Sequence, residues 1–141
     1  MSTDEHRAIV WRAYDTTFNK RDPVGAREYY AADYVGHMPH HQGPTGIDEL
    51  EADGNNILAA FPDVTVTFLD AFGAGDRLVV RHLLTGTHQG ALMGIPPTGK
   101  EIALSGTDIY RFVDGKIAEE WAQPDLFGLL SQLGVIPAPT G

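Results

Sequence analysis

Apolar side chains recur every three or four residues in the first part of the chain, which is typical of helices that bury one face. Residues 4–20 carry such a stripe, which includes Tyr14 and Phe18. An aspartate followed by proline predicts a short second helix over residues 22–33, and a Ser/Thr-x-x-Asp/Glu signal predicts a third over residues 46–60. We therefore expect three helices before the main sheet.

The spacing of apolar residues changes to two from residue 64 onward, as in strands that bury one face. The pattern predicts four strands, over residues 64–72, 77–89, 101–112 and 116–123. Helices first and long strands later favour an α+β domain in which a curved, mainly antiparallel sheet wraps around the helices. We expect one domain over residues 1–141, with a short C-terminal helix after Asp125 and a loose tail from about residue 135.

Composition narrows the range of functions. The chain has 141 residues, of which 43% are hydrophobic and 21% charged, as is ordinary for a globular domain. No stretch approaches the roughly 20 apolar residues of a membrane span, and the polar start shows no export signal, so we expect a cytoplasmic protein. A net charge of −9 without a basic cluster opposes binding to nucleic acid or anionic membranes. Because the chain has no cysteine, thiol chemistry is excluded, and a hydrophobic small molecule is the expected partner.

Asp108 is the first candidate for chemistry. It shares strand parity with Leu104, Tyr110 and Phe112, so it lies among large apolar side chains if that face of the sheet is concave. Burial would raise the pKa of its carboxyl and make it a usable general base. The alternative is that this face points outward, or that Asp108 makes only a structural hydrogen bond.

Asp125, Trp121 and Phe68 each have a structural and a functional interpretation. Asp125 precedes an apolar helical run, which is typical of an N-cap, and a capping residue can also line the mouth of a pocket. Trp121 lies in the last predicted strand, where an aromatic side chain either packs in a core or walls a binding site. Phe68, in the first strand, is a further candidate for such a wall.

The histidines offer acids, bases and hydrogen-bond donors. His37 stands before a Pro-rich turn that holds His40 and His41, while His82 and His88 share parity on the strand over residues 77–89. Each of these is equally interpreted as a half-buried structural histidine. The HxxHH pattern includes no paired carboxylate and lacks the helical spacing of HExxH, so the sequence predicts neither a metal site nor a cofactor.

Arg81 lies beside these strand histidines with the opposite parity. A guanidinium offers a rigid fork of donors for an enolate or carboxylate oxygen, and its alternative role is a surface ion pair. The chain contains no GxGxxG, GxxxxGK[ST] or GxSxG motif, which removes the usual nucleotide-binding and serine-hydrolase interpretations.

Several short motifs follow one another along the chain, in the order DYVGH, AFPDVTV, GTHQG, GIPPTGK, RFVDGKIAEEW and LLSQLG. In this order and spacing the chain resembles the SnoaL-like polyketide cyclases, cone-shaped α+β domains of the nuclear-transport-factor-2 and ketosteroid-isomerase type. The resemblance implies a cofactor-independent isomerase or lyase that abstracts a proton next to a carbonyl of a hydrophobic, polyketide-like compound, giving aldol cyclisation or isomerisation. It also implies a homodimer or homotetramer.

The resemblance further implies an acid/base aspartate on the last strand and a histidine on the strand before it. Ala122 stands at the position of that aspartate, and Asp108 at the position of that histidine. The candidate catalytic residues are therefore Asp108, Asp125, His37, His88 and Arg81, and the candidate substrate-binding residues are Tyr14, Phe18, Phe68, His82 and Trp121.

Two other functions fit the same predicted fold. One is a hydroxylase or epoxide hydrolase of the same fold; epoxide opening would need an Asp/Arg/Asp set, for which Asp108, Arg81 and either Asp125 or Asp70 supply the residue types. A non-catalytic binding module would have an apolar pocket without an ionisable group in reach. The distance between Asp108 and Arg81 and the lining of the pocket discriminate between these hypotheses.

Overall fold

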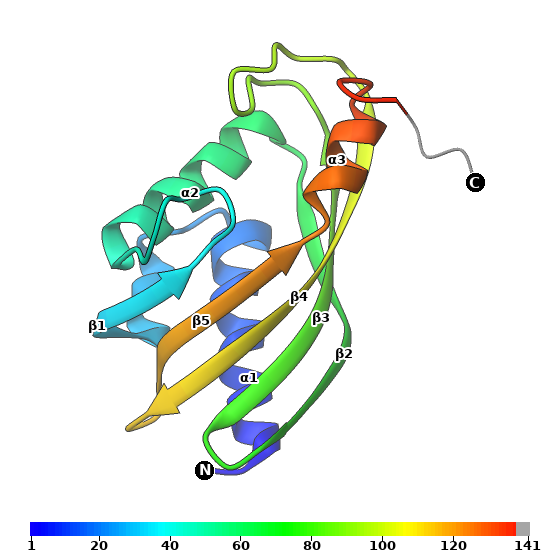
Figure 1. The fold of residues 1–141 in the computed structure, drawn as a ribbon. Helices are drawn as coiled ribbons and strands as arrows, with labels where there is room; N and C mark the ends of the chain where they lie inside the picture. The colour runs from blue at the N-terminus through cyan, green and yellow to red at the C-terminus, as the bar shows by residue number, and fades with distance from the viewer. Residues whose placement is uncertain (138–141) are drawn as a thin grey trace.

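The computed structural model describes residues 1–137, and one curved five-stranded sheet forms the frame of this part of the chain (Figure 1). Its strands are β1 (Tyr30–His37), β2 (Thr65–Ala74), β3 (Arg77–Thr87), β4 (Glu101–Val113) and β5 (Lys116–Pro124). They lie in the order β1-β5-β4-β3-β2. β1 runs parallel to β5, and every other neighbouring pair is antiparallel, so the predicted mainly antiparallel sheet is confirmed.

The helices are α1 (Thr3–Tyr14), α2 (Ile47–Ala60) and α3 (Leu126–Gln132), with a π-helical turn at Asp15–Asn19 and a 3-10 turn at Gly25–Tyr29. The prediction of three N-terminal helices is therefore wrong, because α2 follows β1 and the second helix is only a short turn. Asp22 does accept the N–H of Gly25, the first residue of that turn, at 2.9 Å. The chain then becomes extended at Tyr30, which pairs with Ile117 of β5. Pairing with a distant strand has overridden the local helix signal.

The core lies between α1 and the concave face of the sheet (Figure 1). Along β4, buried and exposed residues alternate from Ile102 to Phe112, and every even-numbered side chain points inward. Val10 and Ala13 of α1 are fully buried against this face. The inward parity of β4 sets Asp108 in the interior, so the alternative in which this face points outward is wrong.

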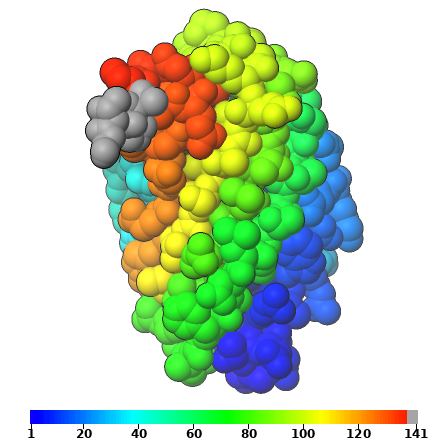
Figure 2. Space-filling model, turned by 90° about the vertical axis from the view of Figure 1, so that its right-hand side faces the viewer, coloured from blue at the N-terminus to red at the C-terminus, as the bar shows by residue number. Residues whose placement is uncertain are grey.

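Figure 2 shows β2, β3 and β4 at the surface, with α3 close to the upper end of β4. This outer face is partly apolar, because Leu69, Phe72, Ile109 and Val113 are exposed on it. Among the described helices, none is both long and apolar enough to cross a membrane. Most of the tail expected to be loose from about residue 135 falls on residues 138–141, outside the described part of the chain.

Candidate active site

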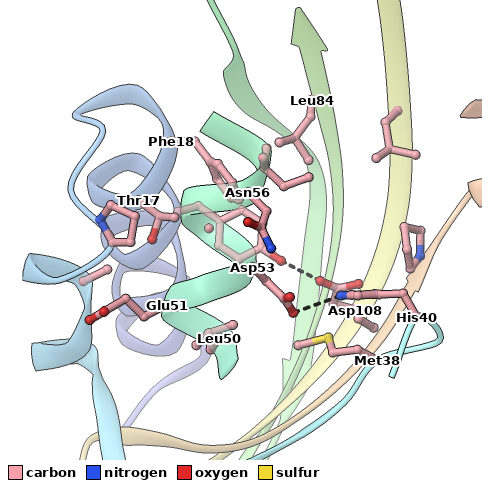
Figure 3. Close-up of a pocket in the computed structure, with 18 of the residues that line it drawn as sticks. Thr17, Phe18, Met38, His40, Leu50, Glu51, Asp53, Asn56, Leu84 and Asp108 are labelled. Atoms are coloured by element: carbon pink, nitrogen blue, oxygen red, sulfur yellow. Dashed lines mark hydrogen bonds and ion pairs between the residues drawn. The ribbon is translucent and has the colours of Figure 1, made fainter. Parts of the chain in front are cut away.

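A cavity of about 500 Å³ opens between the concave face of the sheet and the helices α1 and α2. This volume is in the range of sites for small organic ligands. Most of its lining is apolar, with side chains such as Phe18, Leu50 and Leu84 (Figure 3). Its ionisable lining residues are Tyr14, Arg27, Tyr30, His40, Glu51, Asp53, His82, Asp108 and Glu120. The cavity therefore combines an apolar wall with groups that are able to move a proton.

Asp108 accepts four hydrogen bonds in the wall of this cavity. Its Oδ2 accepts the hydroxyls of Tyr14 at 2.5 Å and Tyr110 at 3.2 Å, and lies 3.2 Å from Nε2 of His82. Its Oδ1 accepts the backbone N–H of Gln123 at 3.2 Å. Because α1, β3, β4 and β5 each supply one or more of these partners, the fold fixes the carboxyl in one orientation.

The pKa of the Asp108 carboxyl lies below its usual range, although burial by itself raises it. The opposing causes are the hydrogen bond and positive charge of His82 and the hydrogen bond from Tyr14. Donors directed at the ionised form thus outweigh desolvation, and the expectation of a raised pKa is wrong. Asp108 is consequently ionised at neutral pH, as a general base must be.

Glu120 is a second buried carboxyl at the cavity, and the sequence analysis missed it. It accepts the hydroxyl of Tyr34 at 2.8 Å and is 4% exposed. Burial and the negative charge of Asp108 raise its pKa well above the ordinary value of a glutamate. The pKa values of the two carboxyls are therefore displaced in opposite directions, which is the division expected of a base and an acid in one site. The signal that could have identified Glu120 is its strand parity with Ala122 in the AEEWA segment.

The structure brings three of the predicted substrate-binding residues to the cavity together with Asp108. These are Tyr14, Phe18 and His82. Phe68 packs edge-on against Tyr14, with ring centroids 5.4 Å apart, and supports the cavity wall from behind without lining it.

Asp125 and Arg81 do not line the cavity. Asp125 caps α3, where its Oδ1 accepts the N–H of Gly128 at 2.9 Å. Arg81 is exposed and pairs with Thr107 on the outer face of the sheet, opposite to Asp108. Asp125 and Arg81 instead share a shallow depression of about 150 Å³ on that outer side. An Asp/Arg/Asp set that includes Asp108 and Arg81 is therefore not assembled.

His37, Trp121 and His88 also lie away from the cavity. His37 is 2.7 Å from the carboxylate of Glu119 and stacks on Trp121 with ring centroids 5.3 Å apart. His88 is fully buried, and its Nδ1 accepts the N–H of Thr98 at 3.1 Å. These contacts tie β1 to β5 and hold the segment after β3, which are structural roles.

The match to known proteins agrees with this architecture. The SnoaL-like polyketide cyclase family model matches residues 8–133. Aklanonic acid methyl ester cyclase DauD from Streptomyces sp. (strain C5) is 42% identical over 134 residues, which cover 91% of this chain and 78% of that protein. Nogalonic acid methyl ester cyclase from Streptomyces nogalater is 42% identical over 52 residues, and this match covers 37% of this chain and 39% of that protein.

Solved structures of similar proteins share this fold. AclR from Streptomyces galilaeus, a proposed hydroxylase, superimposes with a TM-score of 0.87 at 28% identity, covering 99% of this chain and 87% of that one. IdmH from Streptomyces antibioticus, a proposed polyketide cyclase, gives a TM-score of 0.79 at 28% identity, with 91% and 97% covered. The fold is thus that of the cone-shaped α+β enzymes. The chain belongs to the SnoaL-like polyketide cyclase family, and the resemblance seen in its sequence is confirmed.

Proposed function

We propose that the protein is a cofactor-independent cyclase that closes a ring in a hydrophobic polyketide by intramolecular aldol addition. The observation that supports this proposal most strongly is the buried, ionised carboxylate of Asp108 in the wall of a largely apolar cavity. Relatives that share the family are named as cyclases of aklanonic acid methyl ester, and we extend a substrate of that class, a polyketide methyl ester, to this chain.

Asp108 acts as the base in the proposed reaction. Its Oδ2 is saturated by Tyr14, Tyr110 and His82, whereas Oδ1 accepts one hydrogen bond and keeps a second acceptor position. We assign this position to the proton removed from the carbon next to a substrate carbonyl. The tyrosine and histidine donors stabilise the ionised carboxylate before the reaction.

Glu120 acts as the acid. A neutral carboxyl donates a hydrogen bond to an oxygen on which negative charge develops, and in a site of low polarity this interaction is stronger than in water. We assign it to the enolate oxygen or to the alkoxide that forms when the enolate carbon attacks the second carbonyl. Asp108 then returns its proton to the product, so no atom is gained or lost and no redox partner takes part.

The hydroxylase alternative is kept because AclR has the same fold over nearly all of this chain. The two reactions differ in the mass of the product. With a purified polyketide methyl ester and no added cofactor, an aldol cyclase gives a product isomeric with its substrate, as mass spectrometry and a changed chromatographic retention would show. A product heavier by one oxygen atom would contradict the proposal and favour hydroxylation.

We also propose that the protein assembles as a homodimer or homotetramer through the outer face of the sheet. Leu69, Phe72, Ile109 and Val113 are exposed there, and an apolar patch of this kind is typical of a protein contact. Light scattering coupled to gel filtration should give a multiple of the 15.3 kDa chain mass. A mass of one chain at micromolar concentration would contradict this assignment.

A further inference from the structure

Two histidines and one aspartate converge at the wall of the cavity, and the proposed reaction uses none of them. His40 and His41 lie in the segment between β1 and α2, and Asp53 lies on α2. Nε2 of each histidine is 2.9 Å from Oδ2 of Asp53. Figure 3 shows Asp53 and His40 directed toward each other, and both line the cavity.

The local backbone places the two imidazoles side by side. Met38 accepts the N–H of His41 at 3.2 Å, closing a turn with Pro39 at its second position, where proline is favoured. The rings of His40 and His41 have centroids 4.5 Å apart and are tilted by 46°. Neighbouring residues in a chain often point apart, so this turn is what directs both rings toward α2.

We propose that His40, His41 and Asp53 form a binding site for a divalent transition-metal ion such as Zn²⁺. Their ligand atoms all lie within 4.8 Å of one another. A tetrahedral ion with bonds of about 2.0–2.1 Å separates its ligand atoms by roughly 3.4 Å, so shifts of about 1 Å in the side chains create the site. Two imidazoles and a carboxylate are a ligand set that zinc and iron sites both use.

The three side chains supply the atom types that a divalent ion needs, which are two imidazole nitrogens and a carboxylate oxygen. The sequence pattern disfavoured a metal because HxxHH has no neighbouring carboxylate, and the fold supplies that carboxylate from a helix, twelve residues beyond His41.

Three protein ligands leave an open coordination position, and His40 and Asp53 line the cavity. A ligand with adjacent ketone or phenol oxygens would complete the coordination from the cavity side. This last step rests on the proposed function, whereas the metal site itself does not, and the experiment therefore measures metal binding without substrate.

The test is titration of the apo protein with Co²⁺ and Zn²⁺, followed by visible absorption and calorimetry. We expect one ion per chain with a dissociation constant in the micromolar range or below, and Co²⁺ absorption bands typical of four or five ligands. Asp53→Asn and His41→Asn should each weaken binding at least tenfold. Asp48→Asn is the matched control, because Asp48 lies on the same helix and contacts Arg27 instead.

Two results would overturn the proposal. One is a wild-type protein that binds neither ion at concentrations up to 100-fold above the protein. The other is an Asp53→Asn variant that binds as tightly as the Asp48→Asn control. Either result would assign the cluster to hydrogen bonding alone, as a tie between the β1–α2 segment and α2. Catalytic turnover does not enter this measurement, so a failed metal site and a failed cyclase are distinguishable.

Discussion

Asp108 and Ala122 are paired directly across β4 and β5, and both line the cavity. In the family pattern the acid/base aspartate is expected at position 122 and a histidine at position 108. In this chain the carboxylate stands on β4, and His82 of the next strand supplies the imidazole. The site thus retains a carboxylate and a histidine in contact, with each displaced by one strand.

Placing an aspartate at position 122 should weaken the site that this chain has. Residues paired across strands have Cβ atoms about 4.5–5.5 Å apart, so Ala122→Asp sets two carboxylates against each other. The negative charge would raise the pKa of Asp108, moving the acid limb of the kcat/KM profile to higher pH. We expect a loss in free energy of unfolding of about 1–3 kcal/mol.

Ala122→Asn is the control for this change, because it adds the same volume without the charge. Ala122→Asn should lose part of the same free energy of unfolding and leave the acid limb of the kcat/KM profile at its wild-type pH. If the aspartate and asparagine variants had the same pH–rate profile, the assignment of the acid limb to Asp108 would be contradicted.

Glu120→Gln should stabilise the protein increasingly as the pH rises. The pKa of Glu120 is raised above 4.5 in the folded state, so its stabilising contribution is complete below that pH and is lost as the pH rises through the raised value. Glutamine cannot ionise and shows no such loss. Between pH 4.5 and the raised pKa, the variant should gain about 1.4 kcal/mol over the wild type per pH unit. Urea unfolding at several pH values measures this difference.

Glu119→Gln is the matched control, because the contribution of Glu119 to stability changes with pH in the opposite direction. Hydrogen bonds from His37 and Arg111 lower the pKa of Glu119, so its contribution is present at neutral pH and is lost on acidification. The Glu119 variant should therefore be the less stable protein at pH 7. A Glu120→Gln variant with the same pH dependence as the wild type would show that Glu120 is not held neutral.

Strands β2 to β5 were predictable from the local pattern, whereas β1, which occupies part of the predicted second helix, was not. Alternation over residues 101–112 gave β4 to within one residue, because one face of that strand is fully buried. The Asp22–Pro23 signal precedes only a 3-10 turn, because Tyr30 belongs to a strand whose partner residues lie almost ninety positions later in the chain. A strand partner so distant in the chain cannot be inferred from the local sequence pattern.

The candidate site, like the fold, was only partly predictable from the sequence. Parity grouped Asp108 with Leu104, Tyr110 and Phe112 but left open which way that face points, and it implied that Arg81 and His82 face opposite sides. Strand parity alone could not predict that Tyr14 of α1 contacts Asp108 or that Asp53 of α2 contacts His41, since both contacts depend on how the helices pack. The pKa direction of Asp108 was mispredicted for the same reason, because its donors come from other elements.

Gly106 on β4 leaves the space that His82 occupies. A Cβ at this position would lie 2.6 Å from Cε1 of His82 and 3.3 Å from the backbone of Pro124. Gly106→Ala should therefore displace the imidazole from Asp108, reduce turnover, and cost about 1–3 kcal/mol of stability. Equilibrium unfolding and steady-state kinetics together measure both effects.

The double variant Gly106→Ala/His82→Ala identifies the cause of this loss. If the clash is with the imidazole, the alanine at position 106 costs far less stability once His82 is removed, so the two changes are not additive. Additive losses would locate the strain elsewhere, at the backbone of Pro124.

The rate of ring closure by Asp108→Asn decides whether Asp108 is the catalytic base. The substitution keeps one oxygen, which can accept either from Tyr14 or from the N–H of Gln123 but not from both, and it removes the base. A general base contributes about 10²–10⁴-fold in rate. Asp125→Asn, at the cap of α3 outside the cavity, is the matched control. With both variants folded by near-ultraviolet circular dichroism, we expect the rate of ring closure to fall about 10²-fold or more for Asp108→Asn and to stay at the wild-type value for Asp125→Asn. Wild-type turnover by Asp108→Asn would contradict the assignment of Asp108 as the base.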